Sequence, residues 1–225
     1  MKLLIMRLEA PLMKWGLRSL WNDRDTHIVP TKSGVIGLIS CAMGLKRGDK
    51  KIVELSKRLN MGVRADRRGY FLTDLQIVSS NSNPYIGHLC NSAYKQRTGE
   101  GGLLTYRHYI QDACYTVVLS GDESVLENAA KALCDPIFPV YLGTKCCVPS
   151  RPVFEALTEE YTSVADALCR YPLAEKRMRD RKEDTANCYC EIESENGLHI
   201  RQDEIAINDM REYGYRRVDV KYLGG

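Results

Sequence analysis

The sequence predicts an α+β protein with a ferredoxin-like, RNA-recognition-like body, and three observations carry that prediction. An apolar run at residues 2–8 is typical of a buried strand. Helical patterns follow at 33–45 and 49–59. Further strand patterns and a helix at 123–134 then give the order strand, helix, strand, strand, insertion, strand, helix. This order fits a β-α-β-β-α-β unit that still needs one strand after Pro136.

The two early helices differ in how much of their surface is apolar. In the helix at 33–45 the apolar positions wrap nearly the whole surface, and Ser33 can cap its start. We therefore expect this helix to be buried. The helix at 49–59 is amphipathic, with aliphatic residues on one side and lysines on the other.

The strand patterns surround a long segment of different composition. Residues 61–65 and 72–78 flank the Arg68-Gly69 turn, and an alternating pattern returns at 110–119. Between them, residues 79–107 are first rich in Ser and Asn and then rich in glycine, with few aliphatic residues. A stretch of this kind cannot form core and is typical of a functional insertion or a disordered loop.

We expect two regions along the chain. Residues 1–150 form the ferredoxin-like domain with its insertion, and residues 151–225 form a small β-rich C-terminal appendage. The C-terminal region shows a short helix, a charged run and two strands, at 163–169, 176–184, 187–193 and 216–222.

Composition and charge narrow the class of protein. The 225 residues are 44% hydrophobic, which is enough to build a core. The start of the sequence lacks the pattern of a signal peptide, and no apolar stretch approaches a membrane span, so we expect a soluble cytoplasmic protein without a membrane partner. The net charge of +3 hides an asymmetry, because residues 1–118 carry a net +9. This excess favours a polyanion partner, although an unevenly charged, solvated surface gives the same count.

The nine cysteines are scattered and lack the paired C-x-x-C spacing of a zinc site. Cys188 and Cys190 have the spacing of a metal half-site, but two strand residues on one face give the same spacing. We predict reduced thiols, no metal and no cofactor.

The segment from Pro30 to Gly34 places a hydroxyl, a lysine and backbone N–H groups at the start of the first helix. The positive end of a helix dipole favours a phosphate there. The segment lacks the Walker pattern, and ordinary N-capping explains it as well.

The segment from Tyr141 to Cys146 follows the helix at 123–134 and sets Gly143 beside a hydroxyl and a cation. Glycine lets a backbone approach a ligand closely. An ordinary β-turn accounts for the same residues.

Several segments in order carry a resemblance to a known family. They are residues 10–16, 24–26, 30–38, 106–113 and 141–147. Together they are similar to the CasD-type subunits of type I-E CRISPR Cascade complexes, which belong to the repeat-associated RNA-binding protein superfamily. The similarity covers roughly residues 1–155.

This resemblance implies a non-catalytic RNA-binding subunit with a protruding hairpin, the thumb, at residues 79–107. Such a subunit binds and caps the 5′ handle of the guide crRNA. Its implied partners are a CasC-like backbone subunit, a CasA-like large subunit and, within the complex, target DNA. The thumb tip and residues 176–184 depart from the family pattern.

The residues that the resemblance places near the guide come from the segments described above and from the base of the thumb. They are Arg24, Thr31, Lys32, Ser33, Gly34, Arg107, Tyr141, Gly143, Thr144, Lys145 and Cys146.

A metal-independent endoribonuclease that processes CRISPR repeat RNA, as in type I-C relatives, is the competing interpretation. Such cleavage needs a general base near a 2′-OH, and His108 beside Tyr106 and Arg107 is the most suggestive cluster. Residues two apart in a strand share a face, so Tyr106 and His108 equally fit a packing pair.

Overall fold

The computed structural model describes the chain except residues 18–19, 21, 80–101, 176–186, 208–211 and 225. It shows an α+β protein whose described strands form two sheets. In the larger sheet seven strands follow the order β10-β11-β9-β4-β7-β1-β8, and every neighbouring pair is antiparallel. These strands are β1 (Leu3–Glu9), β4 (Leu59–Arg67), β7 (Cys114–Gly121), β8 (Phe154–Thr158), β9 (Asn187–Glu193), β10 (His199–Ile207) and β11 (Glu212–Gly224).

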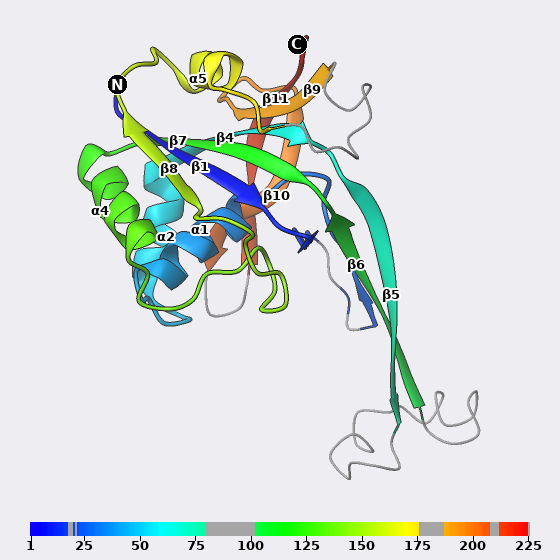
Figure 1. Ribbon diagram of the computed structural model, residues 1–225. Coiled ribbons are helices and arrows are strands. Elements are labelled where there is room, and N and C mark those ends of the chain that lie inside the picture. The colour runs from blue at the N-terminus through cyan, green and yellow to red at the C-terminus, as the bar shows by residue number, and fades with distance from the viewer. Residues whose placement is uncertain (18–19, 21, 80–101, 176–186, 208–211, 225) are drawn as a thin grey trace.

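Helices cover both faces of this sheet. On one side lie α1 (Lys32–Ala42), α2 (Lys50–Arg58) and α4 (Glu123–Cys134), and on the other lies the short α5 (Val164–Arg170) (Figure 1). The two coverings explain the unbroken apolar run of β1. Leu4 and Met6 belong to the larger core, whereas Leu3 and Ile5 pack in the smaller core with α5.

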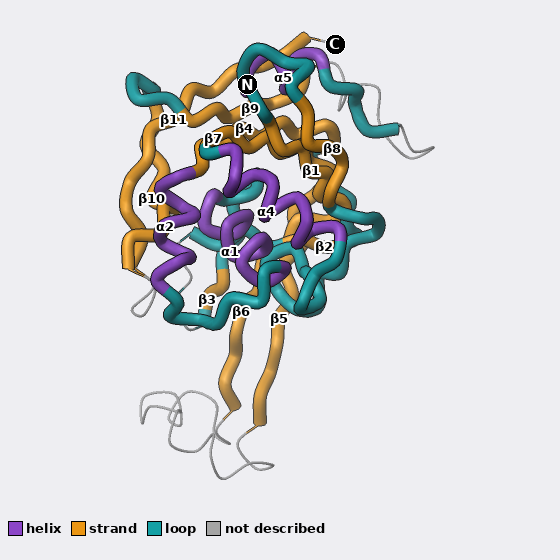
Figure 2. The backbone as a smooth tube through the Cα atoms, turned by 90° about the vertical axis from the view of Figure 1, so that its left-hand side faces the viewer, coloured by secondary structure: helices purple, strands orange, loops and turns teal. Residues whose placement is uncertain are grey.

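The smaller sheet forms an arm that leaves the body (Figures 1 and 2). Its long strands β5 (Tyr70–Ser79) and β6 (Gly102–Gln111) pair antiparallel along their length. Two short strands, β2 (Leu12–Met13) and β3 (Asp23–Arg24), pair with β6 near the body. The expected insertion therefore begins and ends in strands, and residues 80–101 lie outside the described residues.

One predicted strand is divided in the structure. The pattern at 110–119 predicted a single strand, but β6 ends at Gln111 and β7 begins at Cys114. Asp112 between them has a positive φ of 56°, a conformation that Asp tolerates better than most residues. The turn passes the chain from the arm into the larger sheet.

The expected strand after Pro136 is β8, which pairs with β1. The C-terminal region does not form a sheet of its own, because β9 pairs with β4 and extends the larger sheet. Strand β10 was not predicted from the sequence. Among the described residues, no helix is long and apolar enough to cross a membrane.

Candidate functional site

Three cations meet where the arm joins the body. Lys14 follows β2, Arg24 ends β3 and Arg107 lies in β6. Both short strands pair with β6, so Met13 stands opposite Ile110 and Arg24 opposite Arg107. The pairing of three distant segments therefore brings the three positive side chains to one place, which we call the arm-base cluster.

Lys14 lies at the centre of the arm-base cluster. Its Nζ donates a hydrogen bond of 2.8 Å to the carbonyl oxygen of Arg24 and stands 5.3 Å from the centre of the Tyr109 ring. Burial lowers the pKa of Lys14, and the charges of Arg107 and Arg24 lower it further. Repulsion among cations of this kind is relieved when an anion binds.

The side chain of Arg107 also favours binding of an anion at this site. Its Nε is buried and has no hydrogen-bond partner among the described residues. A buried N–H without an acceptor costs free energy, and a phosphate oxygen would remove that cost.

The turn from Tyr141 to Cys147 closes one side of the cluster. The backbone N–H of Lys14 donates to the oxygen of Leu142 over 3.1 Å. Gly143 has φ +95°, and a Cβ there would stand 1.6 Å from the carbonyl oxygen of Lys14. Glycine is therefore required at this position for close approach of the two backbones.

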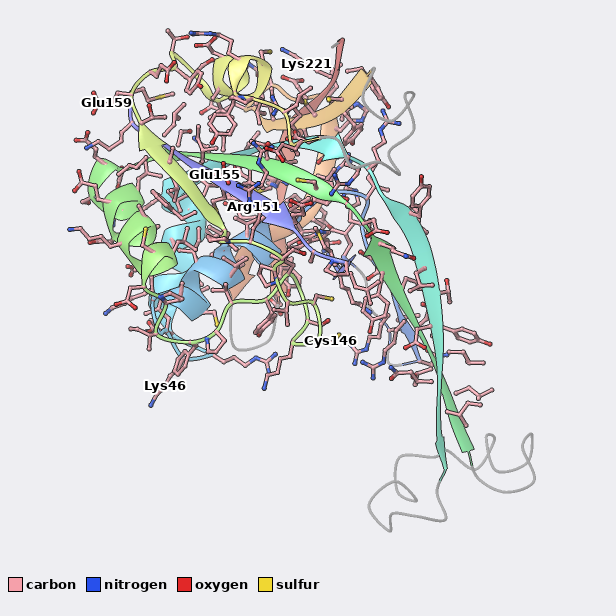
Figure 3. All side chains as sticks on the ribbon, viewed as in Figure 1. Lys46, Cys146, Arg151, Glu155, Glu159 and Lys221 are labelled. Carbon is pink, nitrogen blue, oxygen red and sulfur yellow. The ribbon has the colours of Figure 1, made fainter. Side chains whose placement is uncertain are left out.

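Two neighbouring thiols differ in acidity within this turn. The Thr144 hydroxyl lies 3.2 Å from the sulfur of Cys146 and 3.3 Å from that of Cys147. Hydrogen bonding by Thr144, with a smaller contribution from Tyr109, lowers the pKa of the exposed Cys146. Burial raises the pKa of Cys147. Cys146, labelled in Figure 3, is thus the more acidic thiol of the pair.

The cluster unites five residues that the sequence pointed to separately. Arg24 and Arg107 come from the smaller sheet, and Gly143, Thr144 and Cys146 come from the turn. Tyr141 and Lys145 lie on the same turn, where Lys145 is exposed. Sequence reasoning did not assign Lys14, although its segment at residues 10–16 was among those that carried the resemblance.

The remaining predicted residues lie elsewhere. Thr31 caps α1 by accepting a hydrogen bond from the Gly34 N–H, and Ser33 contacts the Thr31 hydroxyl. At Gly34 a Cβ would stand 2.9 Å from the Trp15 ring, so this glycine serves close packing of the helix.

Lys32 lies inside the protein, away from the arm-base cluster. Its side chain is buried, and Nζ binds Glu193 at 2.7 Å and Glu204 at 3.7 Å. Its backbone N–H donates to Asp203 over 2.7 Å, so a carboxylate of the same chain already occupies the positive end of α1. The anions that Lys32 contacts are therefore carboxylates of its own chain.

His108 lies on the opposite face of β6 from Arg107 and Tyr109, since neighbouring strand residues point to opposite faces. Its Nε2 is 2.9 Å from Asp23 Oδ1, and its Nδ1 is 2.9 Å from the Thr73 hydroxyl. Both ring nitrogens therefore have partners, and the imidazole links three strands of the arm.

An aromatic pocket of about 150 Å³ lies at the foot of the arm, and Ile110 is among its lining residues. Tyr70, Phe71 and Tyr222 supply exposed aromatic surface. The Arg68 guanidinium stands 5.7 Å from the centre of the Tyr222 ring. Aromatic rings and arginine planes are the groups on which unstacked bases pack.

No group of three or more His, Cys, Asp or Glu side chains that could hold a metal ion occurs among the described residues. Cys188 and Cys190 both lie in β9 and are buried.

Comparison with known proteins decides the family. A family model described as CRISPR-associated protein (Cas_Cas5) matches residues 3–219. The chain belongs to this family. It is 30% identical over 156 residues to the CRISPR system Cascade subunit CasD of Escherichia coli strain K12, a match that covers 67% of this chain and 69% of CasD.

Solved structures agree with this assignment. A structure described as a crystal structure of Cas protein has a TM-score of 0.75 and 32% identity, covering 99% of this chain and 95% of that one. A chain of a CRISPR RNA-guided surveillance complex has a TM-score of 0.71 and 26% identity, covering 99% and 91% respectively. The Cas5-family fold thus extends over nearly the whole chain.

Proposed function

We propose that this protein is a non-catalytic subunit of a Cascade-type surveillance complex that binds and caps the 5′ handle of the guide crRNA at the arm-base cluster. The observation that carries the proposal is the convergence of Lys14, Arg24 and Arg107, where Arg107 Nε has no acceptor among the described residues and Lys14 has a lowered pKa. Phosphates of the RNA end would supply the negative charge that these cations lack.

The architecture supports the same proposal. Strands β4, β7, β1 and β8 lie in the order of a ferredoxin-like unit, with α1, α2 and α4 on one face. The β5–β6 arm corresponds to the thumb of this fold, and it exposes Leu75 and Ile77. An exposed apolar arm of this kind fits contact with a CasC-like backbone subunit, and a CasA-like subunit next to the handle would complete the site.

The guide proposal is tested by RNA affinity measured against salt. Arg107→Gln should weaken binding of the handle RNA about tenfold and reduce the salt slope by about one unit, since one phosphate contact is lost. Arg151 provides a matched control, because this exposed arginine pairs with Glu155 away from the cluster (Figure 3). Equal affinities for Arg107→Gln, Arg151→Gln and the parent protein would remove the cluster from the RNA site.

The aromatic pocket gives the proposal a second contact. An unstacked base of the handle would stack there, so Phe71→Ala should weaken binding by about 1 to 3 kcal/mol. The loss should be absent for an RNA that lacks bases at the handle positions, which separates stacking from phosphate contact.

The alternative function is an endoribonuclease that uses His108. A general base must accept a proton from the 2′-OH through a ring nitrogen, and in this structure the two ring nitrogens of His108 contact Asp23 and Thr73. We expect no cleavage of CRISPR repeat RNA in the absence of metal. Cleavage that disappears in His108→Ala would replace the binding proposal with the nuclease.

A further inference from the structure

The cations of the N-terminal half do not all lie at the arm-base cluster. A second group surrounds the start and outer side of α2, on the body and away from the arm (Figure 1). Its members are exposed, and we call them the α2 basic face: Lys46, Arg47, Lys50, Lys51 and Lys57. Lys46 points away from the body in Figure 3.

Helix geometry sets Lys50 and Lys57 on one side of α2, and Lys51 about 100° around the axis from Lys50. Lys50 and Lys57 are seven residues apart, so they project on the same side about 10 Å apart along the axis. The opposite side carries Ile52 and Leu55, which are buried. Glu54 is the exposed acidic residue among these cations.

The lack of salt bridges argues against a purely solvated helix face. Lys50 and Lys51 occupy the first turn of α2, where the side chain of the N-cap residue Asp49 accepts a hydrogen bond from the Lys51 N–H. No salt bridge within the described residues engages any of the five cations, whereas the neighbouring Arg58 pairs with Asp122. The five cations thus form no salt bridge with a described carboxylate, and an external polyanion would neutralise them.

The side chains also indicate which kind of anion fits. The segment from Lys46 to Arg58 contains no aromatic residue, so it offers nothing on which the bases of a single strand could stack. The surface is the outward side of a helix and of the turn before it, with Lys50 and Lys57 in line along the axis. A duplex presents phosphates along a rigid rod and matches such a row without base contacts.

We infer that the α2 basic face is a second nucleic-acid surface, which binds the phosphate backbone of double-stranded DNA without sequence preference. It shares no residue with the arm-base cluster, so guide binding and duplex binding are separable on the same chain.

The test compares two triple variants of the full-length protein that remove the same charge. One carries Lys50→Gln, Lys51→Gln and Lys57→Gln. The control carries Lys131→Gln, Arg217→Gln and Lys221→Gln, which are exposed cations on α4 and β11. Lys221 lies at the opposite end of the body from Lys46 (Figure 3). Binding of a 30-base-pair DNA duplex is followed by fluorescence anisotropy over a salt series.

The α2 triple variant should bind the duplex roughly tenfold or more weakly, with a salt slope lower by about 2 to 3 units. Handle RNA affinity should stay close to that of the control. Glu54→Gln should bind the duplex about threefold more tightly, because it removes the acidic residue from the face. Equal duplex binding by the two triple variants overturns the inference.

Thermal melting distinguishes DNA binding by these lysines from a role in the stability of the fold. Removal of two cations from the first turn of α2 should leave the melting temperature unchanged or raise it slightly. A lower melting temperature for the α2 triple variant, together with no gain for Glu54→Gln, would show that the lysines serve the fold and overturn the inference.

Discussion

Gly143 lies so close to Lys14 that a Cβ atom at position 143 would stand 1.6 Å from the Lys14 carbonyl oxygen. The contact joins the turn after α4 to the segment after β2, and so holds one wall of the arm-base cluster against its central lysine. Because Gly143 also has φ +95°, another residue at this position meets both a steric clash and an unfavourable backbone conformation.

Gly143→Ala should therefore lower the free energy of unfolding by at least about 2 kcal/mol and weaken handle RNA binding, since the turn must move away from Lys14. Urea unfolding measures the first effect. Gly37→Ala is the control, because Gly37 lies inside α1 with open space around its Cα. It should gain up to about 1 kcal/mol. Equal free energies of unfolding for Gly143→Ala and Gly37→Ala would contradict the close contact between Gly143 and Lys14.

Lys32→Met should lower the free energy of unfolding by about 3 kcal/mol, because it leaves the largely buried carboxylate of Glu193 without its cation. RNA affinity should stay unchanged. The double variant Lys32→Met/Glu193→Gln should recover part of the loss, because the unpaired carboxylate is then gone. Loss of RNA affinity in Lys32→Met without loss of stability would restore Lys32 to the RNA site.

Asp66→Asn should cost about 3 to 5 kcal/mol, because Asp66 is the carboxylate that pairs with the buried Arg7 and Arg64. Asp66 also accepts hydrogen bonds from Thr116 and from the backbone of Ala174, both at 2.9 Å.

The exposed pair of Asp122 and Arg58 gives the comparison for this prediction. Asp122→Asn should change the free energy of unfolding by less than about 1 kcal/mol, because solvent screens the pair. Urea unfolding measures the free energy of unfolding of both variants. A loss below about 1 kcal/mol in each would show that the ion pairs of Asp66 do not stabilise the fold.

Cys146 should react with iodoacetamide at a lower pH than an ordinary thiol. Only the thiolate reacts, and because its pKa is lowered, the thiolate is populated at lower pH. The rate should rise through its midpoint below the usual thiol value, and Thr144→Val should move that midpoint upward. Bound handle RNA should slow the reaction.

Mass spectrometry of the labelled peptides follows each cysteine in this experiment. Cys41 is the internal comparison, because burial raises its pKa. Its midpoint should lie above that of Cys146. A shared midpoint for the two thiols would show that the hydrogen bonds at Cys146 do not stabilise its thiolate.

Local sequence patterns were sufficient for most elements. The helix predicted at 123–134 has the same bounds as α4, and the strand predicted at 187–193 has those of β9. Such elements are readable because hydrophobic periodicity reports directly on which side is buried. The sequence pattern did not predict the division between β6 and β7, because apolar residues continue across the turn at Asp112.

The sequence by itself determined the α+β class, the helices and the family, since each rests on patterns within short segments. Only the tertiary structure decided what the polar residues do. Lys14, Arg24 and Arg107 become one site because β2 and β3 both pair with β6. Lys32 is withdrawn from solvent because Glu193, which lies 161 residues away, reaches it. A lysine has the same local sequence whether its partner is a phosphate or a carboxylate of its own chain. Its role is therefore fixed by long-range strand pairing, which local periodicity does not encode.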